Sequence, residues 1–341
     1  MRLRTTTPGA TPPHTPSLLV LRALGLGDLL AGVPALRAVR RAFPGHELVL
    51  AAPAALRDAA AATRCVDTFL PTRAPGRAVP SLAAWRGPPP DLAIDLHGNG
   101  AQSHDALAAL APRRLWSFAR PGLPESAAPR WRADEHERAR WCRFLRAYGI
   151  AADPGELRLP PPATHSPAPG AVVVHPGADA PARCWPAIRY AQVVRRLRAR
   201  GHRVVLTGGP GERALLSAVA SRAGVGPRDV FAGRLPFATL SALLAHAVLL
   251  VSGDTGPAHL AYAHGTASVT LFGPVPPSRW GPPPGPHVAL WHPGPPGDPH
   301  ATAPDPLLLR ISVHEVVDAA LRLVTPAPCP LRTPQGRVHV R

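Results

Sequence analysis

Residues 252–261, Ser-Gly-Asp-Thr-Gly-Pro-Ala-His-Leu-Ala, combine a tight turn with groups that could hold an anion. They follow the apolar run 247–251, so the pattern predicts a strand, a turn and a helix that is capped by Asp254 or Thr255 and has a proline in its first turn. The free backbone N–H groups and the positive dipole end of such a helix attract anions. His259 falls on the first turn and could add a donor. An ordinary capped helix with a solvated histidine is the alternative.

A second turn, residues 24–30, reads Leu-Gly-Leu-Gly-Asp-Leu-Leu after the first apolar run and partly matches a dinucleotide-binding fingerprint. Leu30 stands at the third glycine position, and the carboxylate of Asp28 would repel a pyrophosphate. A carboxylate at a helix start, beyond the carboxyl end of a strand, is better suited to act as a general base that faces a cleft. The alternative is that Asp28 only caps the helix.

Two further turns in the second half of the chain also carry glycine at predicted strand ends. After His-Pro, Gly177 and Ala178 allow close backbone approach, and Arg183 supplies a cation for phosphate. Residues 207–212 read Thr-Gly-Gly-Pro-Gly-Glu, and Glu212 could accept hydrogen bonds from ribose hydroxyls. With the turn at 252–261, three such turns converge on one edge of the predicted sheet. A nucleoside diphosphate is the simplest ligand for them.

The composition indicates a globular protein of two domains, since the chain has 341 residues of which 45% are hydrophobic. Its formal net charge of +17 would usually suggest a nucleic-acid partner. However, the chain has no lysine and is dominated by Ala, Pro, Gly and Arg, which indicates a genomic bias. We interpret the clusters formed by Arg37, Arg40 and Arg41 and by the arginines of 195–200 as solvated helix faces, so no nucleic-acid partner is expected. Attraction to anionic lipid head groups stays open.

The cysteines and histidines show no metal-binding spacing, so no metal site is expected. Four cysteines lie far apart without a Cys-x-x-Cys pair, which argues against zinc and against a disulfide framework and fits a reducing cytoplasm. His136, in Asp-Glu-His-Glu-Arg, is interpreted as part of a solvated helix face. No apolar run reaches the roughly 18 residues of a membrane span.

Short apolar runs alternate with amphipathic ones in both halves of the chain, which predicts two parallel α/β units. In the first half we expect strands at 17–22, 47–51, 66–70, 92–96 and 115–118 and helices at 28–43, 54–62, 103–110 and 134–148. In the second half we expect strands at 171–175, 203–207, 247–251 and 268–272 and helices at 186–200, 212–223, 237–245 and 257–263.

These elements predict the domain organisation. We expect a disordered leader at 1–16, a first domain at 17–160, a linker at 161–170, a second domain at 171–311, a C-terminal helix at 312–325 and a disordered tail at 326–341. The segment 273–306 is rich in Pro and Gly and is too long for a plain turn. It is either a functional loop or a partly disordered insertion.

Several motifs recur together. They are Gly27-Asp28 with Pro34, His-Pro-Gly-Ala and Arg-x-Trp-Pro within 175–186, Gly-x-Pro-x-Glu at 208–212, Asp-Thr-Gly-Pro-x-His-Leu at 254–260, and Leu-Phe-Gly-Pro and Arg-Trp-Gly-Pro within 271–282. From about residue 17 to residue 324 the chain thereby resembles the bacterial ADP-heptose lipopolysaccharide heptosyltransferases, glycosyltransferase family nine. The resemblance implies the GT-B architecture, two Rossmann-like domains with parallel sheets facing across a cleft. It also implies an inverting, metal-independent transfer and a C-terminal helix that returns to the first domain.

The resemblance implies roles for single residues on the donor side. Asp28 matches the general base, and Glu212 matches the acid that binds ribose. Asp254 matches the acid beside the donor sugar, and the donor pyrophosphate would contact Thr255, Gly256 and His259. Arg183 stands where the family usually has Lys, and the turn at Gly177 and Ala178 completes the donor side.

The acceptor side is implied more loosely. The segment 95–103 occupies the place of the acceptor loop but lacks the basic residue often found before its serine. The acceptor-side candidates are Gly27, His97, Asn99, Gln102 and Ser103.

Together, residues and resemblance predict an enzyme that moves a heptose or related sugar from an ADP-sugar to a hydroxyl of a glycan or glycolipid. The ADP-sugar is a co-substrate, and no cofactor is expected. A cytoplasmic location is expected, with peripheral contact to the inner membrane surface as an option. The alternatives are a different nucleotide sugar in another envelope glycan or a secondary metabolite, and a catalytically inactive nucleotide-sugar-binding protein. A nicotinamide or flavin oxidoreductase is disfavoured because its Gly-rich turn is missing.

Overall fold

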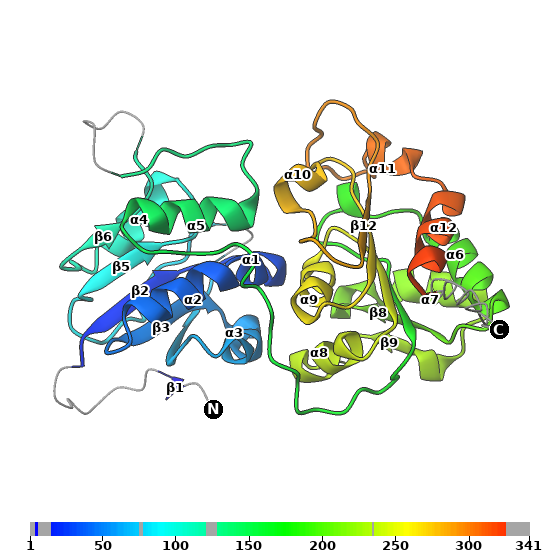
Figure 1. The fold of residues 1–341 in the computed structure, drawn as a ribbon, viewed down its shortest axis with the longest axis horizontal. Helices are drawn as coiled ribbons and strands as arrows, with labels where there is room; N and C mark the ends of the chain where they lie inside the picture. Colours follow the sequence, from blue (N-terminus) through cyan, green and yellow to red (C-terminus); the bar gives the residue numbers. More distant parts are fainter. Residues whose placement is uncertain (1–3, 6–14, 75–77, 121–127, 234, 325–341) are drawn as a thin grey trace, which may run out of the picture.

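The structure is a computed structural model that describes residues 4–5, 15–74, 78–120, 128–233 and 235–324. These residues form two α/β domains side by side, each built on a six-stranded sheet (Figure 1). All the strand pairs in both sheets are parallel. The predicted fold class is confirmed.

The first sheet has the strand order β1-β4-β3-β2-β5-β6, with β2 and β3 at its centre. Its strands are β1 (Arg4–Thr5), β2 (Ser17–Leu21), β3 (Glu47–Pro53), β4 (Thr68–Thr72), β5 (Leu92–Asp95) and β6 (Leu115–Trp116). Its helices are α1 (Leu26–Ala31), α2 (Val33–Ala42), α3 (Arg57–Thr63), α4 (Ala101–Ala108) and α5 (Glu137–Ala147).

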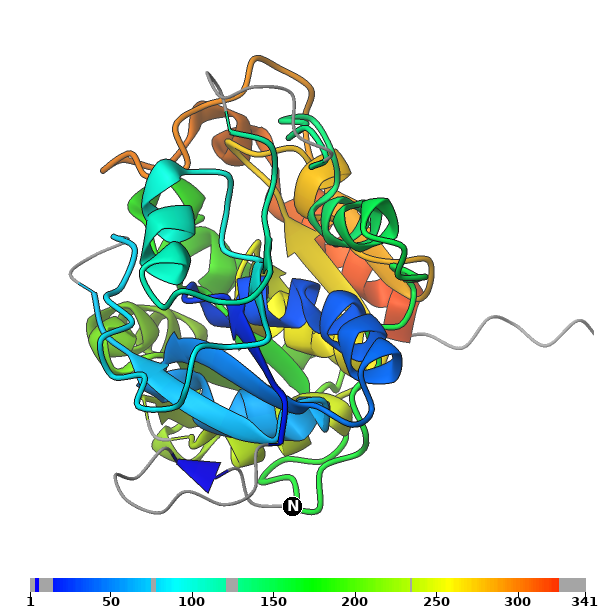
Figure 2. The ribbon, with the colours of Figure 1, turned by 90° about the vertical axis from the view of Figure 1, so that its left-hand side faces the viewer.

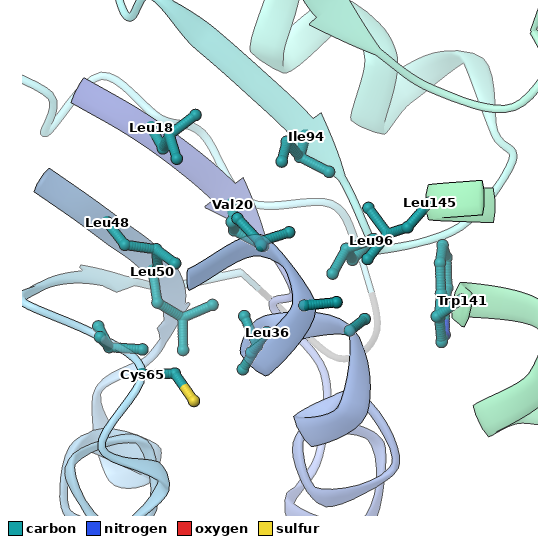
Figure 3. Close-up of a cluster of buried hydrophobic side chains, with 14 of the residues drawn as sticks. Leu18, Val20, Leu36, Leu48, Leu50, Cys65, Ile94, Leu96, Trp141 and Leu145 are labelled. Carbon is teal, nitrogen blue, oxygen red and sulfur yellow. The ribbon is translucent and has the colours of Figure 1, made fainter. Parts of the chain in front are cut away.

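Helices cover both faces of this sheet, which is why its central strands are continuous apolar runs. On one face, Leu18 and Val20 of β2 lie in one cluster with Leu36 of α2 and Trp141 of α5 (Figure 3). The alternate residues of β2 pack on the other face, in a cluster that includes Leu107 of α4. Figure 2 looks onto the first domain and shows α4 on one side of the sheet and α2 and α5 on the other.

The second sheet has the order β12-β11-β10-β7-β8-β9. Its strands are β7 (Val172–His175), β8 (Val204–Gly208), β9 (Val230–Ala232), β10 (Leu249–Gly253), β11 (Ser268–Leu271) and β12 (His287–Leu290). Its helices are α6 (Ala187–Ala199), α7 (Arg213–Ala223), α8 (Phe237–Ala245), α9 (Gly256–His264), α10 (Pro277–Trp280), α11 (Pro306–Arg310) and α12 (Val313–Val324). Residues of α6, α7 and α12 share one buried cluster, and residues of α8 and α9 share the cluster on the other face.

The helix expected at 28–43 is two helices, because the chain turns at Gly32 between α1 and α2. Gly32 packs against the side chain of Arg22, and a Cβ atom at Gly32 would lie 2.8 Å from Arg22 Nε. Apolar periodicity continued through this position and therefore concealed the break.

The leader expected to be disordered contributes a strand. Arg4 and Thr5 form β1, which pairs with Thr68 and Phe69 of β4. A two-residue edge strand leaves no periodic pattern in a Thr- and Pro-rich sequence. Residues 1–3 and 6–14 of that leader lie outside the described residues.

The C-terminal helix α12 packs on the second domain, so the expectation that it returns to the first domain is wrong. Val316, Ala319 and Ala320 lie in the buried cluster that also contains residues of α6, β10 and β11. Figure 1 shows α12 on the side of the second domain that faces away from the first. Its apolar side chains pack against β10, β11 and β12 of the second sheet, beside α6. The tail expected at 326–341 lies outside the described residues.

The two domains contact each other through α1 and α9. Leu30 and Val33 of the first domain share a buried cluster with Ala258 and Ala261 of α9. Nearby, the backbone N–H of Leu159 donates to the carbonyl of Ala263 at 3.0 Å. The domains are therefore joined by apolar packing as well as by the chain. Within the part of the chain that the structure describes, no helix is both long and apolar enough to cross a membrane.

Candidate active site

A cavity of about 420 Å³ lies between the domains, where the carboxyl ends of β2, β7, β8 and β10 meet. Ligands bind at this edge in open parallel sheets. The first domain contributes the α1 turn, Gly25 to Asp28. The second domain contributes predicted donor-side residues, namely Ala178, Arg183, Glu212, Asp254, Thr255, Gly256 and His259. The structure thus brings the two sets of turns to one cavity.

Asp28 lies in the first turn of α1, with its carboxyl group in the cavity wall. Its Oδ2 accepts a hydrogen bond from the backbone N–H of Gly25 at 3.1 Å, so Asp28 does cap its helix, as the alternative interpretation expected. Burial raises the pKa of the Asp28 carboxyl, while the positive charge of Arg22 opposes that rise. A carboxylate with a raised pKa is a stronger base than an ordinary one.

Arg22 holds the turn that carries Asp28, and sequence reasoning missed it. Its side chain is fully buried, and its Nε donates to the backbone carbonyl of Asp28 at 2.6 Å. Its Nη1 donates to the carbonyl of Leu96 at 2.5 Å, and its Nη2 pairs with Glu137 at 3.2 Å. Arg22 therefore connects the ends of β2 and β5 with α1 and α5. Its only sequence signal was an arginine at the end of an apolar run.

The start of α9 forms the opposite wall. Thr255 is the N-cap residue, and Pro257 lies in the first turn, as predicted. The Thr255 hydroxyl caps no backbone N–H, and its Oγ1 is buried without a hydrogen-bond partner among the described residues. The free N–H groups of this helix start are therefore available to an anion.

Two glycines let α1 and α9 approach closely. A Cβ atom at Gly27 would lie 2.9 Å from Cδ2 of His259, and one at Gly256 would lie 3.0 Å from Cβ of Leu26. Gly27, a candidate for the acceptor side, thus faces a donor-side residue. The glycines set the distance between the turn of Asp28 and the start of α9.

Arg183 reaches the cavity from the short 3-10 helix Pro181–Arg183. Its Nη1 donates to the carbonyl of Asp254 at 3.4 Å, and its Nη2 lies 3.7 Å from the exposed carboxylate of Asp179. Its Nε and Nη2 atoms are buried, and neither has a hydrogen-bond acceptor among the described residues. Buried guanidinium donors without acceptors are costly, so this arrangement indicates a site for an anionic ligand.

Glu212 lies at the turn after β8. Its Oε2 accepts from the backbone N–H of Gly209 at 2.6 Å and lies 3.8 Å from Nε2 of His175. Burial raises the pKa of the Glu212 carboxyl and lowers that of His175 to about 4, so the imidazole is neutral. A Cβ atom at Gly177 would overlap the Glu212 carboxylate, at 1.7 Å. Gly177 is therefore required to seat Glu212, although it does not line the cavity itself.

His259 lies between Asp254, which precedes α9, and the aromatic rings of Tyr262 and Trp280. Its Nε2 lies 3.5 Å from Oδ1 of Asp254, and its ring makes edge contacts with Tyr262 and Trp280. It is buried, so the solvated histidine of the alternative interpretation is wrong.

The Pro-rich segment 273–306 forms part of the cavity wall. The sequence did not decide whether this segment is a functional loop or a partly disordered insertion. The segment contains α10 and β12, and it contributes Val275, Arg279, Trp280, Pro299 and His300 to the wall. The functional-loop alternative is therefore favoured. Its signal in the sequence was the Arg-Trp-Gly-Pro motif.

The acceptor-side candidates of the 95–103 segment do not line this cavity. His97 accepts from the N–H of Ala23 through Nδ1 at 3.2 Å, and Ser103 Oγ donates to the carbonyl of Gly100. Asn99 and Gln102 are exposed. The role of these residues in acceptor binding stays a prediction.

His136 is not part of a solvated helix face. It is the N-cap residue of α5, and its Nε2 lies 3.1 Å from the carbonyl oxygen of Gly281 in the second domain. Nη1 of buried Arg138 donates to the same carbonyl at 3.2 Å. The start of α5 thereby holds the turn that follows Trp280. Only tertiary contacts could show this, because the two segments are far apart in the chain.

Among the residues that the structure describes, no group of three or more His, Cys, Asp or Glu side chains could hold a metal ion. The positive groups that face the cavity are instead arginine side chains and a helix start.

Comparison with known families points to one class of protein. The model of "Glycosyltransferase family 9 (heptosyltransferase)" matches residues 145–294, a stretch that contains the donor-side turns. Lipopolysaccharide heptosyltransferase 3 of Escherichia coli is 36% identical over 113 residues. That alignment spans 33% of this chain and 33% of the relative.

Solved structures extend the similarity to the fold of both domains. The glycosyl transferase family 9 protein from Veillonella parvula DSM 2008 superposes with a TM-score of 0.74 at 20% identity, covering 93% of this chain and 99% of that chain. ADP-heptose lps heptosyltransferase II of E. coli superposes with a TM-score of 0.71 at 18% identity, covering 90% and 98% of the two chains. The arrangement is the GT-B fold of these proteins, as the resemblance implied.

Proposed function

We propose that this chain is an inverting glycosyltransferase that uses an ADP-sugar donor, because residues 145–294 match the model of glycosyltransferase family 9. The transferred sugar is a heptose or a related sugar, and the acceptor is a hydroxyl of a glycan or glycolipid. The family model and the relative lipopolysaccharide heptosyltransferase 3 support this class of donor and acceptor.

One observation carries the proposal. The Nε and Nη2 atoms of Arg183 are buried at the cavity, beside the start of α9, without acceptors among the described residues. A diphosphate would supply these acceptors and would also accept from the free N–H groups at Thr255 and Gly256. Glu212 lies in the same cavity, where a carboxylate can accept from ribose hydroxyls.

The chemistry is a single displacement. Asp28 takes the proton of the acceptor hydroxyl, the acceptor oxygen bonds to the anomeric carbon, and the bond from that carbon to the diphosphate oxygen breaks. ADP leaves with the electron pair, and the anomeric configuration inverts. Arg183 and the α9 start stabilise the charge that develops on the leaving diphosphate, and so the reaction needs no metal ion.

A second candidate function is nucleotide-sugar binding without transfer. The hydrogen bond from Gly25 to Asp28 favours it, because a helix cap alone would explain this carboxylate. A non-heptose donor from another envelope glycan or a secondary metabolite remains within the enzyme proposal. We further propose action in the cytoplasm at the inner face of the membrane, where a glycolipid acceptor is presented.

The test compares wild type, Asp28→Asn and Asp58→Asn on a panel of nucleotide sugars that includes ADP-heptose. Thermal shift reports binding and ADP release reports transfer. We expect ADP-sugars to bind all three proteins, and Asp28→Asn to lower turnover by about 100-fold or more. Asp58, exposed in the first turn of α3, is the matched control. Unchanged turnover in Asp28→Asn, or loss of activity with a chelator, would contradict the mechanism.

A further inference from the structure

A second cavity, of about 520 Å³, lies away from the active site, between α2, the end of α3 and the connecting segment 158–160. Five arginines line it, together with Thr63, Cys65, Leu159 and Pro160. They are Arg37, Arg40, Arg41, Arg64 and Arg158. No carboxylate belongs to its wall among the described residues. A cavity of this volume is of the size that binds small molecules.

The positive charge of this cavity is only partly compensated. Arg40 pairs with Asp67 at 2.5 Å, and Arg41 pairs with Glu156 at 2.6 Å. Within the described residues, no carboxylate pairs with the other three, Arg37, Arg64 and Arg158. The arginines of α2, which were expected to form a solvated helix face, therefore form one wall of a cationic cavity.

The backbone of Arg64 adopts a conformation that is unfavourable for a residue with a side chain. Arg64 is the C-cap residue of α3 with a φ of 57°, in the left-handed region where glycine is usual. A residue held there in spite of that preference suggests that its side chain has a function. The guanidinium is exposed and so is free to meet a ligand.

Arg158 and Arg37 tie this cavity to the junction of the domains. The Arg158 guanidinium fills the space above Gly265 at the end of α9, where a Cβ atom would lie 1.6 Å from its Nη1. Arg37 donates to the backbone carbonyl of Arg158, and the next residue, Leu159, is bonded to Ala263. A ligand in the cavity would therefore touch the first domain and the segment that leads into the second.

Helix capping explains only part of this cluster. Arg40 donates to the carbonyl of His46 at 2.7 Å and also to that of Phe43, so it serves the end of α2. Arg64 is the C-cap residue of α3, and the Arg158 guanidinium lies against Gly265, the C-cap residue of α9, so both are cations at the negative ends of helix dipoles. Arg37 lies within α2 and is placed for no helix end, and separate helix ends do not explain why all five arginines line one cavity.

We propose that this cavity is an anion site for a phosphomonoester or diphosphate group, separate from the donor site. Three guanidinium groups without a carboxylate partner among the described residues match the charge of such a group, and the planar fork of arginine matches its oxygens. The volume leaves room for the sugar or lipid that carries the phosphate. The site goes beyond the proposed glycosyl transfer and does not depend on it.

Calorimetry with inorganic pyrophosphate on the full chain tests the site. The variants are Arg64→Gly and Arg158→Gln, each made in wild type and in Arg183→Ala, which weakens binding at the donor site. The control is Arg222→Gln, at an exposed residue of α7. Arg64→Gly suits the left-handed position, so the fold should be kept, as its melting temperature can verify. We expect each cavity variant to weaken, by about tenfold, the binding that persists in Arg183→Ala.

Two further arms identify the source of the phosphate. Glucose 1-phosphate represents a soluble phosphomonoester, and phosphatidylcholine vesicles with added phosphatidic acid represent a lipid headgroup. Vesicle binding that is lost in Arg64→Gly and Arg158→Gln assigns the site to lipid, and binding of glucose 1-phosphate alone assigns it to a soluble ligand. The proposal is overturned if both variants bind pyrophosphate as wild type does, or if Arg183→Ala abolishes all binding.

Discussion

Asp28 caps α1 and has a raised pKa. The capping contact stabilises the fold, whereas burial of the charged carboxylate destabilises it and makes Asp28 a stronger base. Its Oδ2 accepts from Gly25, while burial raises the pKa of the carboxyl above its ordinary value. A general base must be deprotonated, so we expect kcat/KM to fall with decreasing pH through a pKa above that of an ordinary Asp. The pH profile of wild type measures this. A profile that is flat down to pH 4 would rule out Asp28 as the titrating base.

The same shift makes a prediction for stability. Because the folded-state pKa is raised, the contribution of Asp28 to stability is fully present below the unfolded pKa and is lost as pH rises through the folded pKa. Asp28→Asn should therefore be more stable than wild type at neutral pH, and this difference should vanish in acid. Urea unfolding at several pH values measures it, with Asp58→Asn as the exposed control. A variant less stable than wild type at pH 7 would show that the cap outweighs burial.

The role of Arg183 in donor binding gives a further prediction for a single residue. Charge-assisted hydrogen bonds are worth about 1.5–3 kcal/mol, so Arg183→Ala should weaken ADP binding roughly tenfold to a hundredfold. Arg183→Lys should restore part of the affinity, because it keeps the charge and loses the fork. Calorimetry with ADP compares the three proteins. Equal affinities would remove Arg183 from the donor site.

At the scale of elements, the position of α1 depends on a buried ion pair. Arg22 joins β2, β5 and α1, and its partner Glu137 also accepts from Nε1 of Trp141 at 2.7 Å. Removing one member of such a pair leaves a buried charge and usually costs about 3–5 kcal/mol. Glu137 also pairs with buried Arg140, so its charge keeps one partner in Arg22→Met, and Glu137→Gln would in turn leave Arg140 unpaired. We therefore expect Arg22→Met to destabilise the chain strongly, because the carbonyls of Asp28 and Leu96 lose a buried donor, and the addition of Glu137→Gln to recover none of that loss.

A matched control exists in an exposed pair, Arg203 and Asp229, at 2.8 Å. Arg203→Met should change the free energy of unfolding by less than about 1 kcal/mol. Chemical denaturation of the four proteins measures these values. Equal losses for Arg22→Met and Arg203→Met would show that the buried network does not hold α1.

At the scale of the whole molecule, α5 clamps one domain to the other. Arg138 and His136 both meet the carbonyl of Gly281, next to Trp280 in the cavity wall. We expect Arg138→Met to loosen the domains and to weaken ADP binding by about tenfold, because the turn with Trp280 loses a charged partner. Small-angle scattering should show a larger radius of gyration.

The control for this clamp is Arg143→Met on the same helix, whose side chain pairs with Glu135 within the first domain. It should leave both ADP binding and the radius of gyration unchanged. If Arg138→Met behaves in the same way, the contact with Gly281 does not couple the domains.

Much of the fold could be predicted from the sequence, because strands and helices follow local patterns. The helix expected at 237–245 is observed as α8 (Phe237–Ala245), and most other boundaries differ by a few residues. The predictions failed where the cause was not local. The helix expected at 28–43 is interrupted at Gly32, where the distant Arg22 leaves no room for a side chain. The strand β12 lies within a Pro-rich segment and pairs with β11 at the edge of the sheet.

The sequence by itself determined the strand-turn-helix units, since glycine, proline and capping residues act on their own neighbours. It therefore placed Asp28, Glu212 and the start of α9 at strand ends that meet at one cavity. Only the tertiary structure decided the contacts between distant segments. The pairing of Arg22 with Glu137, the clamp on Gly281 and the second arginine cavity each join residues from separate elements. No periodicity encodes such contacts, because they depend on how complete elements pack.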